Sequence, residues 1–212
     1  MPGRRPPPPN RTLPVRKTEA VLAILDISGC TNFIVKRVVA LEHAEQIITD
    51  LIGTLIDDAE RPFVVNKLEG DAMLLFAETD GATAATVAAT WRLVDRAFGQ
   101  FERSLERIRD QRSHCNCDAC ANVGNLRLKA FLHVGEITVK QVRQFEEIAG
   151  EPVILLHRLM KNSLASREYV LFTDSYHAAL APPPAAAVPH SEVAEGFGPV
   201  ALHVFDRSNP SS

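Results

Sequence analysis

Residues 22–33, LAILDISGCTNF, carry the pattern that decides the fold. The stretch begins inside an apolar, partly β-branched run that ends at Asp26, which is typical of a buried strand. Gly29 allows the backbone to approach a phosphate closely, and Ser28 and Thr31 offer hydrogen-bond donors before the start of a helix. The stretch therefore predicts a strand, a polar turn and a helix, with space for an anion at the turn.

The chain on either side extends this pattern. Apolar residues recur at helical spacing in two long segments, and shorter β-rich runs with a Gly-centred hairpin lie between them. The expected helices cover residues 31–58 and 82–109 with a shorter one after Pro152, and the expected strands cover residues 19–26, 63–68, 72–76, 126–134, 136–142, 169–172 and 201–205. This order contains β-α-β-β-α-β, so we expect an α+β fold: a ferredoxin-like antiparallel sheet with helices on one face.

Proline positions predict where the domain begins and ends. Of the 14 prolines, all but Pro62 and Pro152 fall near the two ends of the chain. We therefore expect one domain over residues 18–180 with a cysteine-rich insertion at 113–124. The flanking segments are expected to be a disordered Pro/Arg-rich tail (1–17), a Pro/Ala-rich linker (181–200), an edge strand (201–206) and a second tail (207–212).

Composition excludes several classes of function. The chain has 212 residues, a net charge of −3 and 46% hydrophobic residues, enough for one substantial core. Its longest apolar runs are far shorter than the ~20 residues that cross a bilayer, and its near-neutral charge argues against a nucleic-acid binder. Clustered cysteines are typical of a reducing compartment. We expect a cytoplasmic protein that binds neither membrane nor nucleic acid.

Two carboxylates are the first candidates for chemistry. Asp26 ends the first strand and Asp71 lies in the hairpin KLEGD (67–71), so adjacent strands of such a sheet bring them to one end. Carboxylates held close together repel one another unless a hard divalent cation, Mg²⁺ or Mn²⁺, lies between them. The alternative is that each acid merely forms a turn beside its glycine.

Four segments together resemble one protein family. They are LAILDISGCTNF (22–33), NKLEGDAMLLF (66–76), LKAFLHVGEI (128–137) and FEEIAGEPVILLHRLMKNS (145–163). In sequence and spacing they resemble the class III nucleotidyl cyclases, the adenylyl and guanylyl cyclase family, over residues 20–175. The cysteine cluster indicates an uncharacterised bacterial branch of that superfamily.

The resemblance implies a reaction and a metal site. Asp26 and Asp71 match the family's metal ligands, and the carbonyl oxygen of Ile27 adds a third donor. Two Mg²⁺ or Mn²⁺ ions would activate the 3′-hydroxyl of a nucleoside triphosphate and neutralise the departing pyrophosphate. Ile27, Ser28, Gly29 and Thr31 would lie against the nucleotide. The family shares each site between two subunits, so the resemblance implies a homodimer.

The resemblance also assigns the residues that would read the base and stabilise the transition state. Lys67 matches the residue that reads the purine, and Glu147 matches its acidic partner. Arg158 matches the arginine that stabilises the transition state. The family's asparagine is replaced by Ile154, which has no hydrogen-bonding group. Asn162, one helical turn beyond Arg158, is the candidate to replace it.

The third candidate site is a cysteine cluster. Three thiols and an imidazole match the ligands of a structural Zn²⁺ site, here His114, Cys115, Cys117 and Cys120. Because His114 adjoins Cys115, His133 or a partner chain is an alternative source of the fourth ligand, whereas His43 is expected to be packed in a helix. A redox switch and an inert loop are the alternatives to metal binding.

Three functions follow from these residues. The first is an enzyme that converts a nucleoside triphosphate, with ATP the first choice, to a 3′,5′-cyclic nucleotide. The second is a catalytically weak or inactive cyclase-like module that binds a nucleotide or senses metal or redox state, which Ile154 favours. The third is a zinc-stabilised interaction domain without a nucleotide site.

Overall fold

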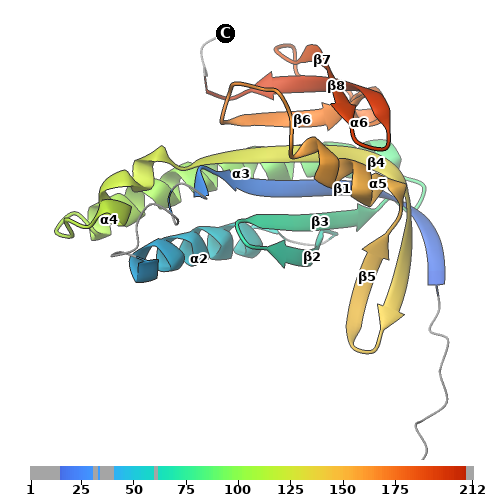
Figure 1. The fold of residues 1–212 in the computed structure, drawn as a ribbon. Helices are drawn as coiled ribbons and strands as arrows, with labels where there is room; N and C mark the ends of the chain where they lie inside the picture. Colours follow the sequence, from blue (N-terminus) through green and yellow to red (C-terminus); the bar gives the residue numbers. More distant parts are fainter. Residues whose placement is uncertain (1–14, 31–32, 34–40, 60–61, 209–212) are drawn as a thin grey trace, which may run out of the picture.

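The computed structural model describes residues 15–30, 33, 41–59 and 62–208 of the chain (Figure 1). Along the chain its elements are β1 (Val15–Ser28), α2 (Leu41–Asp57), β2 (Val64–Glu69), β3 (Ala72–Glu78), α3 (Thr83–Gln111), α4 (Asp118–Asn122), the 3-10 turn η2 (Val123–Asn125), β4 (Arg127–Val142), β5 (Phe145–Ala149), α5 (Glu151–Leu159), β6 (Tyr169–Thr173), α6 (Asp174–Ala179), β7 (Val188–Ala194) and β8 (Gly198–Asp206). No helix in these ranges is both long and apolar enough to cross a membrane.

One sheet of eight strands organises the molecule. Its order is β2-β3-β1-β4-β6-β8-β7, with β5 paired to β4 beside this path. All neighbouring strands are antiparallel except β4 and β6, which run parallel. The predicted α+β class with a mainly antiparallel sheet is confirmed. The central strands β1 and β4 pair along Val15–Ser28, and this pairing places Asp26 of β1 opposite Lys129 of β4.

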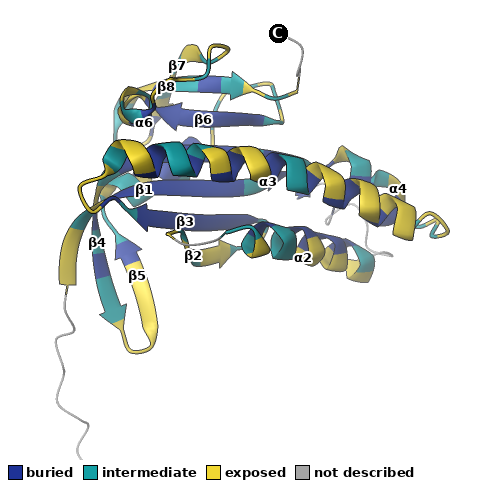
Figure 2. Cartoon of the chain, turned by 180° about the vertical axis from the view of Figure 1, so that it is seen from behind, coloured by how far each residue is buried: buried dark blue, intermediate teal, exposed yellow. Residues whose placement is uncertain are grey.

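The two faces of the sheet carry separate apolar cores, because side chains alternate along each strand. Val21, Ala23 and Leu25 of β1 face the core formed with α2 and α3, whereas Leu22 and Ile24 face the core formed with α5. Figure 2 shows α3 lying along the sheet with its buried side inward. The sequence expectation of helices on one face therefore needs one correction: α5 buries Leu155, Leu156 and Leu159 on the opposite face.

The ends of the domain differ from the sequence expectation. Residues 15–17, expected in the N-terminal tail, open β1, while residues 1–14 lie outside the described part. The expected linker 181–200 contains β7, which forms a hairpin with β8, and the strand expected at 201–206 lies between β6 and β7 instead of at the edge. Proline content suggested a linker, but Pro189 lies in the edge strand β7, where a missing N–H is tolerated. Gly196, at a φ of 87°, lies in the connecting turn.

Strand β4 is longer than either run predicted from sequence. The expected strands 126–134 and 136–142 form one continuous strand through Gly135. A Cβ atom at this position would lie 2.6 Å from Cγ of Pro152, at the start of α5. Glycine is therefore needed here for close packing of α5 on the sheet rather than for a turn.

Candidate functional site

Asp26 and Asp71 come together because β1 and β3 pair. Asp26 lies opposite Ala72 in the antiparallel register, and Asp71 is the residue immediately before Ala72. The backbone N–H of Ile27 donates to the carbonyl oxygen of Asp71 at 3.0 Å, which fastens the β2–β3 turn to the end of β1. The convergence predicted from the sequence is therefore present: two carboxylates from distant segments stand side by side at one end of the sheet.

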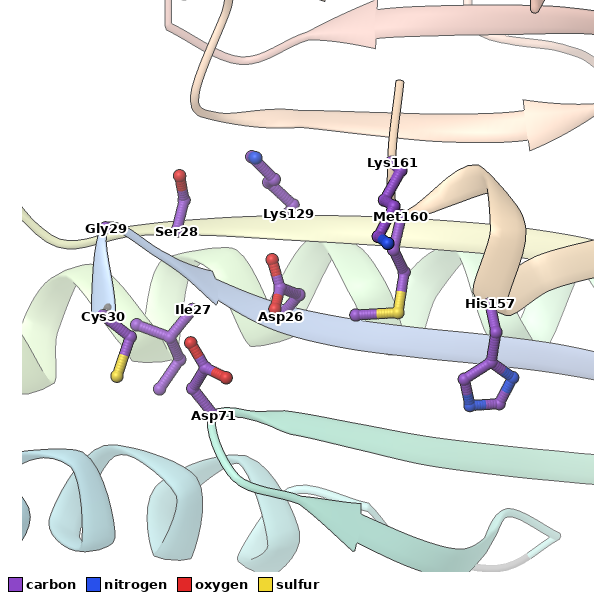
Figure 3. A pocket seen from close by; sticks show the side chains of 10 residues that line it. All are labelled: Asp26, Ile27, Ser28, Gly29, Cys30, Asp71, Lys129, His157, Met160 and Lys161. Carbon is purple, nitrogen blue, oxygen red and sulfur yellow. The ribbon is translucent and has the colours of Figure 1, made fainter. Parts of the chain in front are cut away.

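These carboxylates line an open cleft of about 460 Å³. Figure 3 shows its walls, which come from the end of β1, the β2–β3 turn, β4 and the end of α5. The lining residues are Asp26, Ile27, Ser28, Gly29, Cys30, Asp71, Lys129, His157, Met160 and Lys161. Asp26, Asp71, Ile27, Ser28 and Gly29, which the sequence placed against the divalent cation or the nucleotide, all line this cleft. Thr31, predicted with them, lies outside the described residues.

The cleft changes the acidity of Asp26. Burial and, secondarily, the charge of Asp71 raise the pKa of the Asp26 carboxyl to about 6, while Lys129 opposes the shift. The pair is therefore an unfavourable concentration of negative charge, and a divalent cation between the oxygens would relieve it. Two carboxylates form an all-oxygen donor set, which suits Mg²⁺ or Mn²⁺.

Lys129 also contributes to the cleft, although the sequence motifs do not point to it. This half-buried residue lies opposite Asp26 in the β1–β4 register and lines the same cleft. Its ammonium group is 5.5 Å from the centre of the Tyr169 ring. A lysine inside an otherwise apolar strand was the available signal, because burying such a charge is costly without a nearby anion. Lys161, at the end of α5, adds a second cation to the lining.

The residues expected to read the base lie outside the cleft lining. Lys67 of β2 pairs with Glu69 at 2.9 Å, and this contact raises its pKa more than the charge of Glu147 does. Glu147 lies exposed on β5, a strand that approaches β2 where Asn66 donates to the carbonyl oxygen of Glu146 at 3.1 Å. The two predicted residues are thus on neighbouring strands, but the direct partner of Lys67 is Glu69.

Glu69 also binds α5. The Nε2 atom of His157 lies 3.0 Å from a Glu69 carboxylate oxygen, and its Nδ1 atom lies 2.7 Å from the carbonyl oxygen of Val153. His157 is thus hydrogen-bonded through both ring nitrogens and is also part of the cleft wall. His157 of α5 thus ties this helix to the β2–β3 hairpin beside the cleft.

The two candidate catalytic residues, Arg158 on α5 and Asn162 just after this helix, differ in their surroundings. Arg158 is exposed and pairs with Glu195 at 2.8 Å, so its guanidinium can exchange one carboxylate for another anion. Asn162 does not line the cleft: its amide donates to the Tyr169 hydroxyl at 2.8 Å and to the Leu159 carbonyl at 2.9 Å. The side chain of Asn162 thus fixes the end of α5 to β6, and the replacement of the family's asparagine by Asn162 stays a prediction.

A second group of side chains gathers where α2 meets α4. His43 in α2 joins Cys115, Cys117 and Cys120, and the four ligand atoms all lie within 4.8 Å of one another. His114, which the sequence analysis placed in this cluster, is exposed and is not a member. The structure therefore replaces His114 with His43, which the sequence expected to be packed in its helix. These three thiols and one imidazole can hold a metal ion.

Comparisons with known sequences identify a family. Residues 48–169 match the family described as protein of unknown function (DUF2652). The Uncharacterized protein Rv2561/Rv2562 of Mycobacterium tuberculosis is 30% identical over 160 residues, which are 75% of this chain and 73% of that protein.

Comparisons with solved structures identify the fold. The adenylyl cyclase CyaB from P. aeruginosa superposes with a TM-score of 0.71 at 15% identity, over 94% of this chain and 100% of that chain. A class III adenylyl cyclase-like ATP-binding protein from Pseudomonas aeruginosa gives a TM-score of 0.65 at 15% identity, over 79% of this chain and 36% of that chain. The chain thus has the fold of class III adenylyl and guanylyl cyclase catalytic domains, as the sequence resemblance implied.

Proposed function

We propose that this chain, which belongs to the DUF2652 family, is a nucleotidyl cyclase that converts a nucleoside triphosphate, with ATP the first choice, to a 3′,5′-cyclic nucleotide and pyrophosphate. One observation carries the proposal: Asp26 and Asp71 converge in a cleft that also presents Lys129 and Lys161, at the end of a cyclase-type sheet. Carboxylates suit the metal ions and lysines suit the triphosphate, so one cleft offers both halves of a metal–nucleotide site.

Asp26 and Asp71 would hold Mg²⁺ or Mn²⁺, with the carbonyl oxygen of Ile27 as a further donor. When bound, such ions lower the pKa of an attacking hydroxyl and neutralise a departing pyrophosphate. The carboxylate oxygen atoms are the hard donors that these ions prefer, and the raised pKa of Asp26 reflects burial and the neighbouring charge of Asp71, which a divalent cation would offset. Lys129 already opposes that shift, so it would limit the repulsion between the acids before the cations arrive.

The cleft residues would then orient the triphosphate. Gly29 has a φ of 93°, a left-handed conformation that presents backbone at the end of β1 without a side chain. Lys129 and Lys161 supply positive charge for phosphate oxygens from β4 and α5. In the cyclase family, arginine and base-reading residues reach each site from the second subunit, and we propose the same homodimer for Arg158, Lys67 and Glu147. The compartment that we propose is the cytoplasm.

A second function is favoured by one specific residue. Ile154, on the exposed side of α5, stands where the cyclase family has an asparagine, and it is 53% exposed. An alkyl group cannot bond a ribose oxygen, and losing one such donor typically costs 10²–10³ in rate. The alternative is therefore a catalytically weak or inactive module that binds a nucleotide, and the fold likeness to a cyclase-like ATP-binding protein supports it.

The deciding experiment measures turnover and binding on the same preparation. Purified chain is incubated with Mn²⁺ and each of ATP, GTP, CTP and UTP, and cyclic products are sought by mass spectrometry. We expect one purine triphosphate to give product, and the Asp71→Asn variant to give none. Asp80→Asn is the matched control, since Asp80 lies at the far end of the same hairpin, in a turn after β3.

The outcomes separate the candidates. Product that disappears in Asp71→Asn but persists in Asp80→Asn supports the cyclase. Mn²⁺-dependent nucleotide binding that gives no product, and is lost in Asp71→Asn, supports the inactive module. If neither turnover nor nucleotide binding is observed, the cyclase and the inactive nucleotide-binding module are both excluded, and the zinc-stabilised interaction domain remains.

A further inference from the structure

We propose that His43, Cys115, Cys117 and Cys120 form a structural Zn²⁺ site that clamps α2 to the connection between α3 and β4. The site is independent of the carboxylate cleft and of the proposed reaction. It differs from the cluster visible in the sequence, because its fourth ligand comes from another helix instead of from the cysteine-rich segment itself.

The positions of the four ligand atoms fit a tetrahedral ion. The Nδ1 atom of His43 lies 3.4 Å from Sγ of Cys117, 3.5 Å from Sγ of Cys115 and 3.6 Å from Sγ of Cys120. A tetrahedral Zn²⁺ with bonds of ~2.3 Å to sulfur and ~2.05 Å to nitrogen separates the nitrogen from each sulfur by about 3.6 Å. All three distances agree with this value, so one imidazole nitrogen faces three sulfurs at the spacing of a coordination shell.

Local structure explains why the thiols converge. Cys117 precedes α4 and its sulfur accepts the backbone N–H of Cys120 at 3.5 Å, so the first turn of α4 brings two sulfurs to one side. The N–H of Cys115 donates to the carbonyl oxygen of Arg112, which turns the chain back after α3. N–H groups donated to cysteine sulfur stabilise the thiolate form, which is the form that binds a metal.

The cluster lies where a cross-link has structural value. Arg112 at the end of α3 donates to Gln46 of α2 at 3.0 Å, the polar contact next to the thiols. Cys120 is buried in the core on the α2–α3 side of the sheet, while Cys115 and Cys117 pack at its margin. Figure 1 shows α4 and the start of α2 projecting together beyond the sheet, at the end where β1 finishes. A metal ion would tie these projecting parts to one another.

A disulfide explains the arrangement less well than a metal ion. All four cysteines are free thiols, and Cys30 lies apart in the cleft. A disulfide uses two sulfurs, whereas here three sulfurs surround one imidazole nitrogen at nearly equal distances, so a disulfide would leave the third sulfur and the imidazole unexplained. Four protein ligands fill a tetrahedral shell and leave no position for substrate, so the role of the ion is structural.

The test measures zinc in the full-length chain, purified without chelator. We expect one zinc per chain in the wild type, and less than one-tenth of that in Cys117→Ser and in His43→Gln. His114→Gln is the matched control: it removes the imidazole beside Cys115 that lies outside the cluster, and it should retain full zinc. A wild type without zinc, or equal zinc loss in His114→Gln and His43→Gln, overturns the assignment.

A second measurement covers the case in which the variants do not fold. Wild-type chain is stripped of metal and titrated with Co²⁺, whose visible absorption distinguishes tetrahedral thiolate coordination from octahedral oxygen coordination. We expect the tetrahedral spectrum at one equivalent, and a melting temperature that rises by about 10 °C or more when Zn²⁺ is restored. An octahedral spectrum, or an unchanged melting temperature, contradicts a structural zinc site.

Discussion

The carboxylate cleft and the thiol cluster are both built at the end of the sheet where β1 finishes, and they use opposite chemistry. The cleft has hard oxygen donors and an open volume of about 460 Å³. The cluster has three soft sulfurs and one nitrogen, the four ligands that a tetrahedral ion would need. Closed four-ligand sites stabilise structure, whereas sites with open positions leave room for substrate. One small domain thus keeps an open set of oxygen donors apart from a compact set of sulfur and nitrogen donors.

The largest expected effect comes from removing the Mg²⁺ or Mn²⁺ ions of the carboxylate cleft while zinc stays bound to the thiol cluster. Desalting into metal-free buffer should lower cyclic-nucleotide formation by about 10³-fold or more, because the metal ions contribute several kcal/mol to the transition state. Zinc content should be unchanged, because thiolate coordination releases zinc far more slowly than carboxylates release Mg²⁺. Product formation and zinc are measured on the same sample. Turnover that persists without divalent ions, or zinc lost together with activity, would break the contrast between the two sites.

The second effect concerns the folding stability of the protein when the carboxylate cleft holds no metal ion. Asp26 has a pKa of about 6 in the folded chain against 3.8 in the unfolded chain, so the folded state binds more protons between these pH values. Stability therefore falls as pH rises from about 4 to 6 and stays lower above that range, by up to about 3 kcal/mol. Asp26→Asn should recover this stability at pH 7.5 and show no advantage below pH 4, while losing activity.

Urea unfolding in metal-free buffer at several pH values measures this gain. The control is Asp50→Asn, which changes an exposed carboxylate on α2. An Asp26→Asn variant no more stable than the wild type at pH 7.5 would show that the acidic pair is not strained without metal. The thiol cluster should give the opposite result, since removing one of its ligands should destabilise the protein.

Part of each site could be predicted from the sequence. Residues placed by local strand and turn patterns were predictable, whereas residues brought together only by the packing of distant segments were not. Asp26 lies near the end of one strand, and Asp71 lies in the turn that joins two others. The hydrophobic pattern predicts how these strands pair, so the proximity of the two carboxylates was predictable. His43 is 72 residues from Cys115, and only the packing of α2 beside α4 joins them. Ring orientation and helix packing are not encoded in local spacing, so the sequence favoured the adjacent His114. The same limit hid Lys129, whose role depends on the register between β1 and β4.

Ile154 provides a test of what limits the turnover rate of the proposed cyclase. Ile154→Asn should raise the turnover rate about tenfold or more by restoring a hydrogen-bonding group at the position that the cyclase family uses. Stability should change by no more than about 0.5 kcal/mol, because Ile154 is 53% exposed. Steady-state kinetics of Ile154→Asn and Ile154→Ala provide the measurement. If both variants are equally active, hydrogen bonding at this position does not limit the rate.

The smallest expected effect belongs to the fourth cysteine. Cys30 is buried in the cleft, and burial together with Asp71 raises its pKa to about 12, so its thiol stays protonated. A protonated thiol is a poor metal ligand and a poor nucleophile. Cys30→Ser should therefore keep full zinc content and change stability by less than about 1 kcal/mol. A fall in zinc would mean that the two sites are not separate.

The 72-residue interval between His43 and Cys115 gives a way to recognise the same cluster of one histidine and three cysteines in other sequences. A search for Cys-x-Cys-x-x-Cys alone would collect many unrelated loops. Requiring a histidine near the start of the helix that precedes the β2–β3 hairpin, and three cysteines directly after the long helix that follows this hairpin, would select chains that can form the same four-ligand cluster. Because β2, β3 and α3 lie between, the interval can change with their lengths, whereas the positions of the four ligands relative to α2 and α4 cannot.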